Sequence, residues 1–251
     1  MQETKNIRLA LQYDGSRYHG WQRQKGDITI QELLEEKIRI LTGEQATVTG
    51  AGRTDAGVHA LHQVCNFLTR SRLDPQSFHR ALNSLLPPDI HIDHAETAPL
   101  DFHARFSARS KLYEYRVLNR PERDPFLRAY TWHVPSELDL SEMQKCLPPL
   151  LGRRDFSSFM ASGSRVTDPV REMTKAEVKR SAEGLLIFLF EADGFLRHMV
   201  RNIVGTLVEV GKGRWDSGGF RKILQARDRR LAGIKAPARG LFLKRVRYDL
   251  P

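Results

Sequence analysis

Apolar residues recur at every second position near the start of the chain. They are Ile7, Leu9, Leu11 and Tyr13. This period is typical of a strand with one buried face, and the turn-forming residues Asp14-Gly15-Ser16 predict where the strand ends. We therefore expect a strand over 7–13.

Two helical periods follow in the first half. Thr29 and Glu32 form a capping-box pattern, and Gly43 predicts the end of that helix. The second helix is expected to begin at Asp74-Pro75 and to end at Pro87-Pro88. Its inward residues would be Phe78, Leu82 and Leu85, and further strands are expected at 46–51, 62–68 and 90–98. The order β-α-β-β-α-β predicts a split-βαβ unit with an antiparallel sheet and both helices on one face.

The second half repeats this order with larger elements, although the two halves share no residue-level similarity. Strands are expected at 111–118, 130–134, 170–179, 185–192 and 241–248. Helices are expected at 139–151, 196–210 and 219–227. No low-complexity linker separates the halves. We therefore expect an α+β protein of two domains, 1–105 and 106–251, with a cleft between them.

The composition predicts a folded chain with a nucleic-acid partner. Apolar residues make up 40% of the 251 residues and charged residues 28%, as in ordinary globular proteins. The net charge is +10, and 29 Arg stand against 11 Lys. Residues 1–105 carry 12 basic and 13 acidic side chains, whereas residues 106–251 carry 28 and 17. Because arginine binds phosphate through a planar fork, the basic half predicts a phosphate-binding face; a solvated basic surface is the alternative.

Other classes of protein are disfavoured by what the chain lacks. The first residues contain no apolar run of a signal peptide, and no segment approaches the roughly 20 apolar residues of a membrane span. Cys65 and Cys146 lie far apart in apolar patterns. They are expected to be core thiols, and neither a disulfide framework nor a thiolate metal site is indicated. We expect a cytoplasmic protein with no membrane contact.

The segment AGRTDAGVHA, residues 51–60, is the most unusual in the chain. Two glycines flank Arg53, Thr54 and Asp55 between two expected strands, so a turn is predicted. In one interpretation Asp55 is a catalytic carboxylate, which would need a partner and an enclosing wall. In the other, the segment is a hairpin loop in which Asp55 caps its own turn and Arg53 points to solvent.

Three further patterns do not support a cofactor or a metal. The glycines of residues 50–57 do not fit the G-x-G-x-x-G spacing, and residues 205–212 have one residue too many for a phosphate loop. We expect a helix end at that second segment. Asp55, His59 and His62 match no known zinc spacing and are interpreted as ordinary loop and strand residues.

Basic and aromatic residues are interleaved in residues 102–115, FHARFSARSKLYEY. This pattern suits RNA, because Arg and Lys bind the backbone while Phe or Tyr stacks on an unstacked base. On a strand that begins near Arg109, Tyr113 and Tyr115 share one face. The alternative for each tyrosine is ordinary strand packing.

A pair of arginines lies in the apolar segment 195–207, FLRHMVRNIVGTL. Helical spacing would place Arg197 and Arg201 on one face, four residues apart. A buried arginine in this helix needs a carboxylate or phosphate partner. The alternative is a pair of solvated arginines on the outer face of the helix.

Four motifs in this order are similar to those of the TruA family of tRNA pseudouridine synthases. They are GRTDAGVHA, FHARFSARSKLYEY, FLRHMVRNIVG and the terminal APARGLFL. The opening YDGSRYHGWQRQ and the TIQELLE segment match as well, so the resemblance spans about residues 7–247. Residues 119–128 and 212–219 carry no motif.

This resemblance implies a pseudouridine synthase fold, with two split-βαβ halves of ferredoxin or RRM type, antiparallel sheets and a central cleft. It implies an isomerase that converts uridine to pseudouridine at positions 38–40 of the tRNA anticodon stem-loop, acting as a homodimer without cofactor or metal. It also implies that Asp55 is catalytic, that Tyr113 lies against the target uracil and that Arg201 pairs with Asp55.

The reaction's chemistry agrees with these roles. It breaks the N1 glycosidic bond, turns the uracil and rejoins it to ribose through C5, so the base must leave the stack and be held. The residues leave three roles open for Asp55: attack on ribose, addition to C6 of the base, or removal of a ribose proton. We hypothesise that Arg53 lies near the phosphates of the extruded nucleotide or in the gap that the nucleotide leaves. The alternative function is a non-catalytic RNA-binding protein of the same fold.

Overall fold

The structure is a computed structural model that describes residues 3–164, 166–181 and 183–249. The chain divides into two compact units. The first comprises Met1–Arg109 together with Leu243–Pro251, and the second comprises Ser110–Phe242. The first unit thus takes in the C-terminal strand, whereas the domains expected from the sequence were two continuous halves.

The sheet of the first unit has the strand order β4-β1-β3-β10, with the short β2 on β3. These strands are β1 (Lys5–Tyr13), β2 (Thr49–Gly50), β3 (His59–Thr69), β4 (Ile90–Ala98) and β10 (Leu241–Tyr248). Strand β1 pairs antiparallel with both β3 and β4. Its side chains Ile7, Leu9 and Leu11 are fully buried, while Gln12 is exposed. The alternation that predicted this strand therefore reflects one covered face of the sheet.

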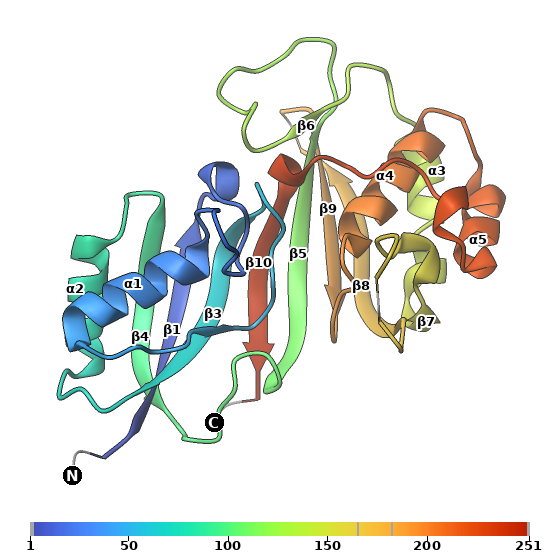
Figure 1. The fold of residues 1–251 in the computed structure, drawn as a ribbon. Helices are drawn as coiled ribbons and strands as arrows, with labels where there is room; N and C mark the ends of the chain where they lie inside the picture. The colour runs from blue at the N-terminus through green and yellow to red at the C-terminus, as the bar shows by residue number, and fades with distance from the viewer. Residues whose placement is uncertain (1–2, 165, 182, 250–251) are drawn as a thin grey trace. The chain divides into compact units, whose positions relative to one another are not determined.

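Two helices of the first unit lie together, as Figure 1 shows. Helix α1 (Ile30–Thr42) begins where the Thr29 hydroxyl accepts a hydrogen bond from the Glu32 amide, 3.4 Å away. It ends at Gly43, whose left-handed φ of 74° suits glycine. Helix α2 (Pro75–Leu85) is capped by Asp74. Both helices were predicted, and so was the order of helices and strands from β1 to β4, whereas β10 was expected in the second half.

The sheet of the second unit has the strand order β5-β9-β8-β7, with β6 parallel to β5 at one end. These strands are β5 (Ala108–Leu118), β6 (Trp132–His133), β7 (Gly152–Asp155), β8 (Val170–Arg180) and β9 (Leu185–Ala192). The pairs β5–β9, β9–β8 and β8–β7 are antiparallel. An α+β fold with mostly antiparallel strands is therefore confirmed.

Three helices pack on one another in the second unit (Figure 1). They are α3 (Leu140–Lys145), α4 (Met199–Gly211) and α5 (Ser217–Ala226). Every residue of α4 except Glu209 is buried, so this helix forms the centre of the unit's core. Short 3-10 turns complete the chain at Gly15–Arg17, Pro148–Leu150, Ser157–Phe159, Arg229–Leu231 and Ala238–Gly240.

Several element boundaries differ from the sequence predictions. Helix α3 ends at Lys145, not at residue 151, because Pro148 and Pro149 lack the amide protons that a continuing helix needs. The strand expected at 46–51 is reduced to β2, and strand β7 was not predicted. Leu85, expected to face inward, is 38% exposed.

Among the described residues, none of the helices has the length and apolar character needed to cross a membrane.

Candidate active site

The Asp55 loop, residues 51–58, joins β2 to β3 in the first unit. Its two ends are fixed by backbone hydrogen bonds, from the Ala51 amide to Val64 O at 2.8 Å and from the Val58 amide to Asp55 O at 3.1 Å. Gly57 makes the turn between them with a φ of 75°. Asp55 is half-buried and Arg53 is exposed. The loop therefore has a defined backbone, and its acidic side chain is partly enclosed.

The opening segment, residues 13–24, packs against this loop backbone to backbone. The Trp21 amide donates to Thr54 O at 3.1 Å, and the Gly57 amide donates to Tyr18 O at 3.2 Å. Gly20 has a φ of +87°, and a Cβ atom there would lie 2.4 Å from Thr54 O. Such a distance is far below van der Waals contact, so only glycine allows the two chains to come this close.

A buried hydrogen bond fixes the residue before Asp55. The Tyr13 hydroxyl lies 2.8 Å from the Thr54 hydroxyl, and both residues are buried. Burial raises the pKa of Tyr13 to about 12, mainly because the phenolate would be desolvated. Tyr13 is therefore protonated at neutral pH, and either hydroxyl of the Tyr13–Thr54 pair can be the donor of this hydrogen bond.

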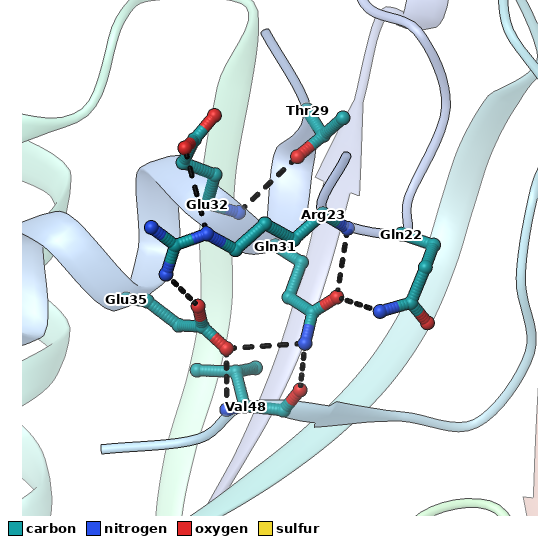
Figure 2. A network of polar contacts seen from close by, with 7 residues as sticks. All are labelled: Gln22, Arg23, Thr29, Gln31, Glu32, Glu35 and Val48. Carbon is teal, nitrogen blue, oxygen red and sulfur yellow. Dashed lines mark hydrogen bonds and ion pairs between the residues drawn. The ribbon is translucent and has the colours of Figure 1, made fainter. Parts of the chain in front are cut away.

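The buried amide of Gln31 holds the opening segment on helix α1, as Figure 2 shows. Its Oε1 accepts hydrogen bonds from Gln22 Nε2 at 2.7 Å and from the Arg23 amide at 2.9 Å. Its Nε2 donates to Glu35 Oε1 at 3.1 Å and to Val48 O at 3.0 Å. Because all four partners engage one side chain, Gln31 ties three segments of the first unit together.

A second buried side chain connects the loop with the end of β1. His59, 1% exposed, follows the loop directly in β3. Its Nδ1 accepts a hydrogen bond from the Gly15 amide at 3.1 Å and lies 3.1 Å from Asp14 Oδ1. His59 thus has a structural place beside the turn, which agrees with its interpretation as an ordinary residue. Within the described part of the chain, no cluster of three or more His, Cys, Asp or Glu is arranged to hold a metal ion.

The two predicted tyrosines lie on β5 in the second unit, and both are buried. Tyr115 is 0% exposed, its hydroxyl donates to Pro237 O at 2.7 Å, and burial raises its pKa. It is a core residue. Tyr113 retains 7% exposure and meets the Phe195 ring edge-on, with centroids 5.0 Å apart. Of the two buried tyrosines, Tyr113 therefore keeps the larger exposed fraction.

Arg201 lies in the first turn of α4 and is 8% exposed. Its Nε donates to Ala236 O at 2.8 Å, and the Ala236 amide donates back to Arg201 O at 3.1 Å. Arg197, expected on the same helical face, precedes the helix, because His198 has a left-handed φ of 64° and α4 begins at Met199. The predicted pair of helical arginines is therefore wrong, and Arg201 is the buried one.

Glycines allow the segment before the last 3-10 turn to lie directly on α4. A Cβ at Gly205 would lie 1.7 Å from Ile234 O, and one at Gly233 would lie 2.8 Å from the Cα of Thr206. Gly205 is therefore a packing glycine inside the helix. Residues 205–211 belong to α4, which confirms the prediction that this segment is no phosphate loop.

Both cysteines are buried, as predicted, and both are free. Burial raises the pKa of the Cys146 thiol to about 12 and raises that of Cys65 as well. Thiols of this kind are protonated at neutral pH and act as small apolar side chains.

The contact of the opening segment with the Asp55 loop is the part of the site that the sequence did not predict. The segment was identified as a match to the family, and its residues 14–16 as the end of a strand. The available signal was the pair Gly15 and Gly20, since a Cβ at Gly15 would lie 2.0 Å from Val58 O. Paired glycines in a short segment indicate close backbone contact, but their partner in the sequence is more than 30 residues away.

Known proteins resemble this chain along nearly all of its length. A family model described as tRNA pseudouridine synthase matches residues 9–107 and 149–249. A tRNA pseudouridine synthase A from Thermoanaerobacter sp. (strain X514) is 43% identical over 244 residues, which are 97% of this chain and 100% of that protein. Proteins of the same name from Acetivibrio thermocellus and Clostridium acetobutylicum are 44% and 42% identical with the same coverage.

One solved structure, that of an unknown protein from Galdieria sulphuraria, covers 85% of this chain and 94% of its own, with 12% identity and a TM-score of 0.24. A likeness this weak carries no argument about the fold.

Proposed function

The chain belongs to the tRNA pseudouridine synthase family, and from this we propose that it isomerises uridine to pseudouridine in tRNA, with Asp55 as the catalytic residue. Positions 38–40 of the anticodon stem-loop, which the TruA resemblance implies, are the uridines proposed to be modified. The observation that carries the proposal is the family match over both 9–107 and 149–249, because the first segment contains Asp55 and the second contains Arg201.

The geometry of the Asp55 loop supports a catalytic role. Base detachment and rotation require a carboxylate that keeps its position while the substrate moves. Thr54, the residue before Asp55, is held by the Tyr13 hydroxyl and by the Trp21 amide. A partly enclosed carboxylate on a backbone fixed in this way meets the requirement better than one on a loose hairpin.

Tyr113 and Arg201 are proposed as substrate-site residues. Tyr113 presents an aromatic ring at 7% exposure, which suits stacking on an extruded uracil. It lies between the two segments of the family match, so its role rests on the resemblance of the FHARFSARSKLYEY segment to the TruA family. Arg201 is proposed to pair with Asp55, because a guanidinium would keep that carboxylate ionised in a closed pocket.

The remaining roles are predictions from the sequence and its resemblance. Arg53 is exposed, as a residue that reaches RNA phosphates would be. Four further features are also predictions. They are a central cleft between domains 1–105 and 106–251, a homodimer, a cytoplasmic location, and catalysis without cofactor or metal. They enter the proposal as expectations of the TruA resemblance.

The test is pseudouridine formation in a tRNA transcript, read by carbodiimide-blocked primer extension. Asp55→Asn should lower the rate at least about 10³-fold, because it removes the reacting carboxylate without changing its size. Asp93→Asn, which removes an exposed carboxylate on β4, is the matched control and should keep the wild-type rate. Wild-type turnover by Asp55→Asn would contradict the catalytic assignment.

Two further outcomes separate the remaining alternatives. Arg53→Ala should raise the tRNA concentration needed for half-maximal rate by roughly tenfold while the rate at saturation survives, since one phosphate contact would be lost. If the wild-type protein binds tRNA but forms no pseudouridine at any position, the chain is a non-catalytic RNA-binding protein and the proposal is wrong.

A further inference from the structure

Two hollows in the second unit lie beside strand β7 and differ in charge. The larger, of about 730 Å³, is lined by three arginines and a single carboxylate; they are Arg154, Arg221, Arg227 and Asp155. The smaller, of about 210 Å³, is lined by two arginines and three carboxylates; they are Arg153, Arg171, Asp168, Glu172 and Asp193. Arg153 and Arg154 are neighbours on one strand, but Arg153 lines the hollow with a net negative lining and Arg154 the hollow with a net positive lining.

The one carboxylate of the larger hollow is already engaged. Asp155 Oδ2 lies 3.1 Å from Arg227 Nε. Its Oδ1 accepts hydrogen bonds from the Ser157 amide at 2.9 Å and from the Ser157 hydroxyl at 2.6 Å. Asp155 therefore balances Arg227 and leaves two positive charges in the hollow.

Those two charges belong to Arg154 and Arg221, which are exposed and form no ion pair within the residues that the structure describes. Both side chains line the same hollow, so one anion bound there would neutralise charge on both and accept hydrogen bonds from their guanidinium groups.

The walls of the larger hollow restrict what that anion can be. Pro148, Pro149 and Leu224 give it an apolar side next to the arginines. The guanidinium group binds phosphate with two parallel hydrogen bonds, and a sugar ring packs on apolar surface. Phosphate joined to ribose, as in the backbone of RNA, matches both features, whereas a bare inorganic anion uses only the first.

We propose that the Arg154–Arg221 hollow binds backbone phosphates of the tRNA. This inference rests on the proposed function, since tRNA is the substrate it names. Neither arginine lies in any of the motifs that carry the family resemblance, and Arg221 lies two residues after the motif-free segment 212–219. The hollow contributes to affinity and not to chemistry, because its arginines contact phosphate and not the reacting base.

The test measures the tRNA dissociation constant by filter binding over a series of salt concentrations. Arg154→Ala and Arg221→Ala should each weaken binding several-fold, and should each reduce the slope of log K against log salt by about one. The double variant should lose about two units of slope while pseudouridine formation at saturating tRNA keeps its wild-type rate. Arg153→Ala, the matched control on the same strand, should keep nearly the wild-type slope.

The outcomes separate this inference from the proposed function. A double variant with wild-type affinity and slope, or an Arg153→Ala variant that loses as much as Arg154→Ala, overturns the hollow as a phosphate site. Either result leaves pseudouridine formation by the wild-type protein intact. A wild-type protein that binds no tRNA overturns both proposals. Because both arginines are exposed, unchanged thermal unfolding of the variants serves as the check on folding.

Discussion

The Asp55 loop and helix α4 hold their candidate residues in different ways. The position of the loop is set by backbone hydrogen bonds and by the contact with Gly20. Helix α4 is buried along almost its whole length, so Arg201 is held by packing and by the reciprocal bonds with Ala236. The position of Asp55 thus depends on backbone shape, and that of Arg201 on the stability of a core.

This difference predicts how each region fails. Damage to the packing around α4 should unfold the second unit, because the helix is its centre. Damage to the contact between the opening segment and the Asp55 loop should displace Asp55 within a unit that still folds. Glycines offer the sharpest comparison, since each region contains one in contact with the backbone of another segment.

The largest effect is expected from Gly205→Ala in α4. The new Cβ would meet Ile234 O at 1.7 Å, and the neighbour is backbone that cannot turn aside. Alanine gains about 1 kcal/mol in helix propensity, but overpacking against backbone costs more, so we expect a net loss of at least about 3 kcal/mol. Urea unfolding measures it. Gly218→Ala, in the exposed first turn of α5, should be neutral or stabilising.

A smaller effect on stability, with a larger one on the reaction, is expected from Gly20→Ala. Its Cβ would press on Thr54 O at 2.4 Å and on the Asp55 carbonyl carbon at 2.9 Å. A shift of about 1 Å at a catalytic group costs roughly 100-fold in rate. The measurement is pseudouridine formation at saturating tRNA, beside the free energy of unfolding.

Gly26→Ala is the matched control for this experiment. Gly26 has a φ of +86°, close to the +87° of Gly20, but nothing lies within 4 Å of its Cβ position. It should lose about 1 kcal/mol of stability from backbone strain alone and keep the wild-type rate. If Gly20→Ala and Gly26→Ala lower the rate of pseudouridine formation equally, the contact of Gly20 with Thr54 does not position Asp55.

The smallest effect is expected from Tyr13→Phe. It removes the hydroxyl that meets Thr54 at 2.8 Å and leaves a buried group without that partner, at a cost of about 1–2 kcal/mol. The rate should fall by several-fold. If the variant loses the expected ~1–2 kcal/mol of stability but keeps the wild-type rate, this hydrogen bond stabilises the fold and does not position Asp55.

The pH dependence of stability tests whether the effect of Tyr13→Phe comes from the buried Tyr13 hydroxyl. The pKa of Tyr13 is raised from 10.0 to about 12, so the folded state favours the protonated phenol. Its contribution to stability is complete below about pH 10 and is lost as the pH rises from 10 towards 12. The difference in unfolding free energy between wild type and Tyr13→Phe should therefore narrow above about pH 10.

Local signals in the sequence predicted most elements, because caps and periods act over a few residues. Helix α1 begins after Thr29 and ends before Gly43, as its capping box and glycine indicate. Strand β4, predicted over 90–98, spans Ile90–Ala98. The start of α4 was missed because the left-handed conformation of His198 is rare for a residue with a side chain and leaves no pattern in the sequence.

The candidate site was harder to predict, because its supports are distant in the chain. The loop, the aromatic positions and the arginine positions made Asp55, Arg53, Tyr113 and Arg201 candidates. The roles of Asp55, Tyr113 and Arg201 come from the TruA resemblance, and that of Arg53 is a hypothesis. The contact of Trp21 with Thr54 and the place of Gln31 involve residues separated by a whole helix or more. Periodicity carries no information about such pairs, since they depend on how the elements pack.

The C-terminal strand makes the first unit discontinuous, and this has a consequence for biosynthesis. Strand β10 neighbours β3, and the Val246 amide donates to His62 Nδ1 at 3.4 Å, although the two residues lie 184 positions apart. During translation, the segments that surround Asp55 leave the ribosome early, but the sheet beneath them stays one strand short until Leu241–Tyr248 is made. The first unit is thus the first to begin folding and the last to finish, so a nascent chain interrupted within the second unit lacks the strand that completes the sheet behind the Asp55 loop.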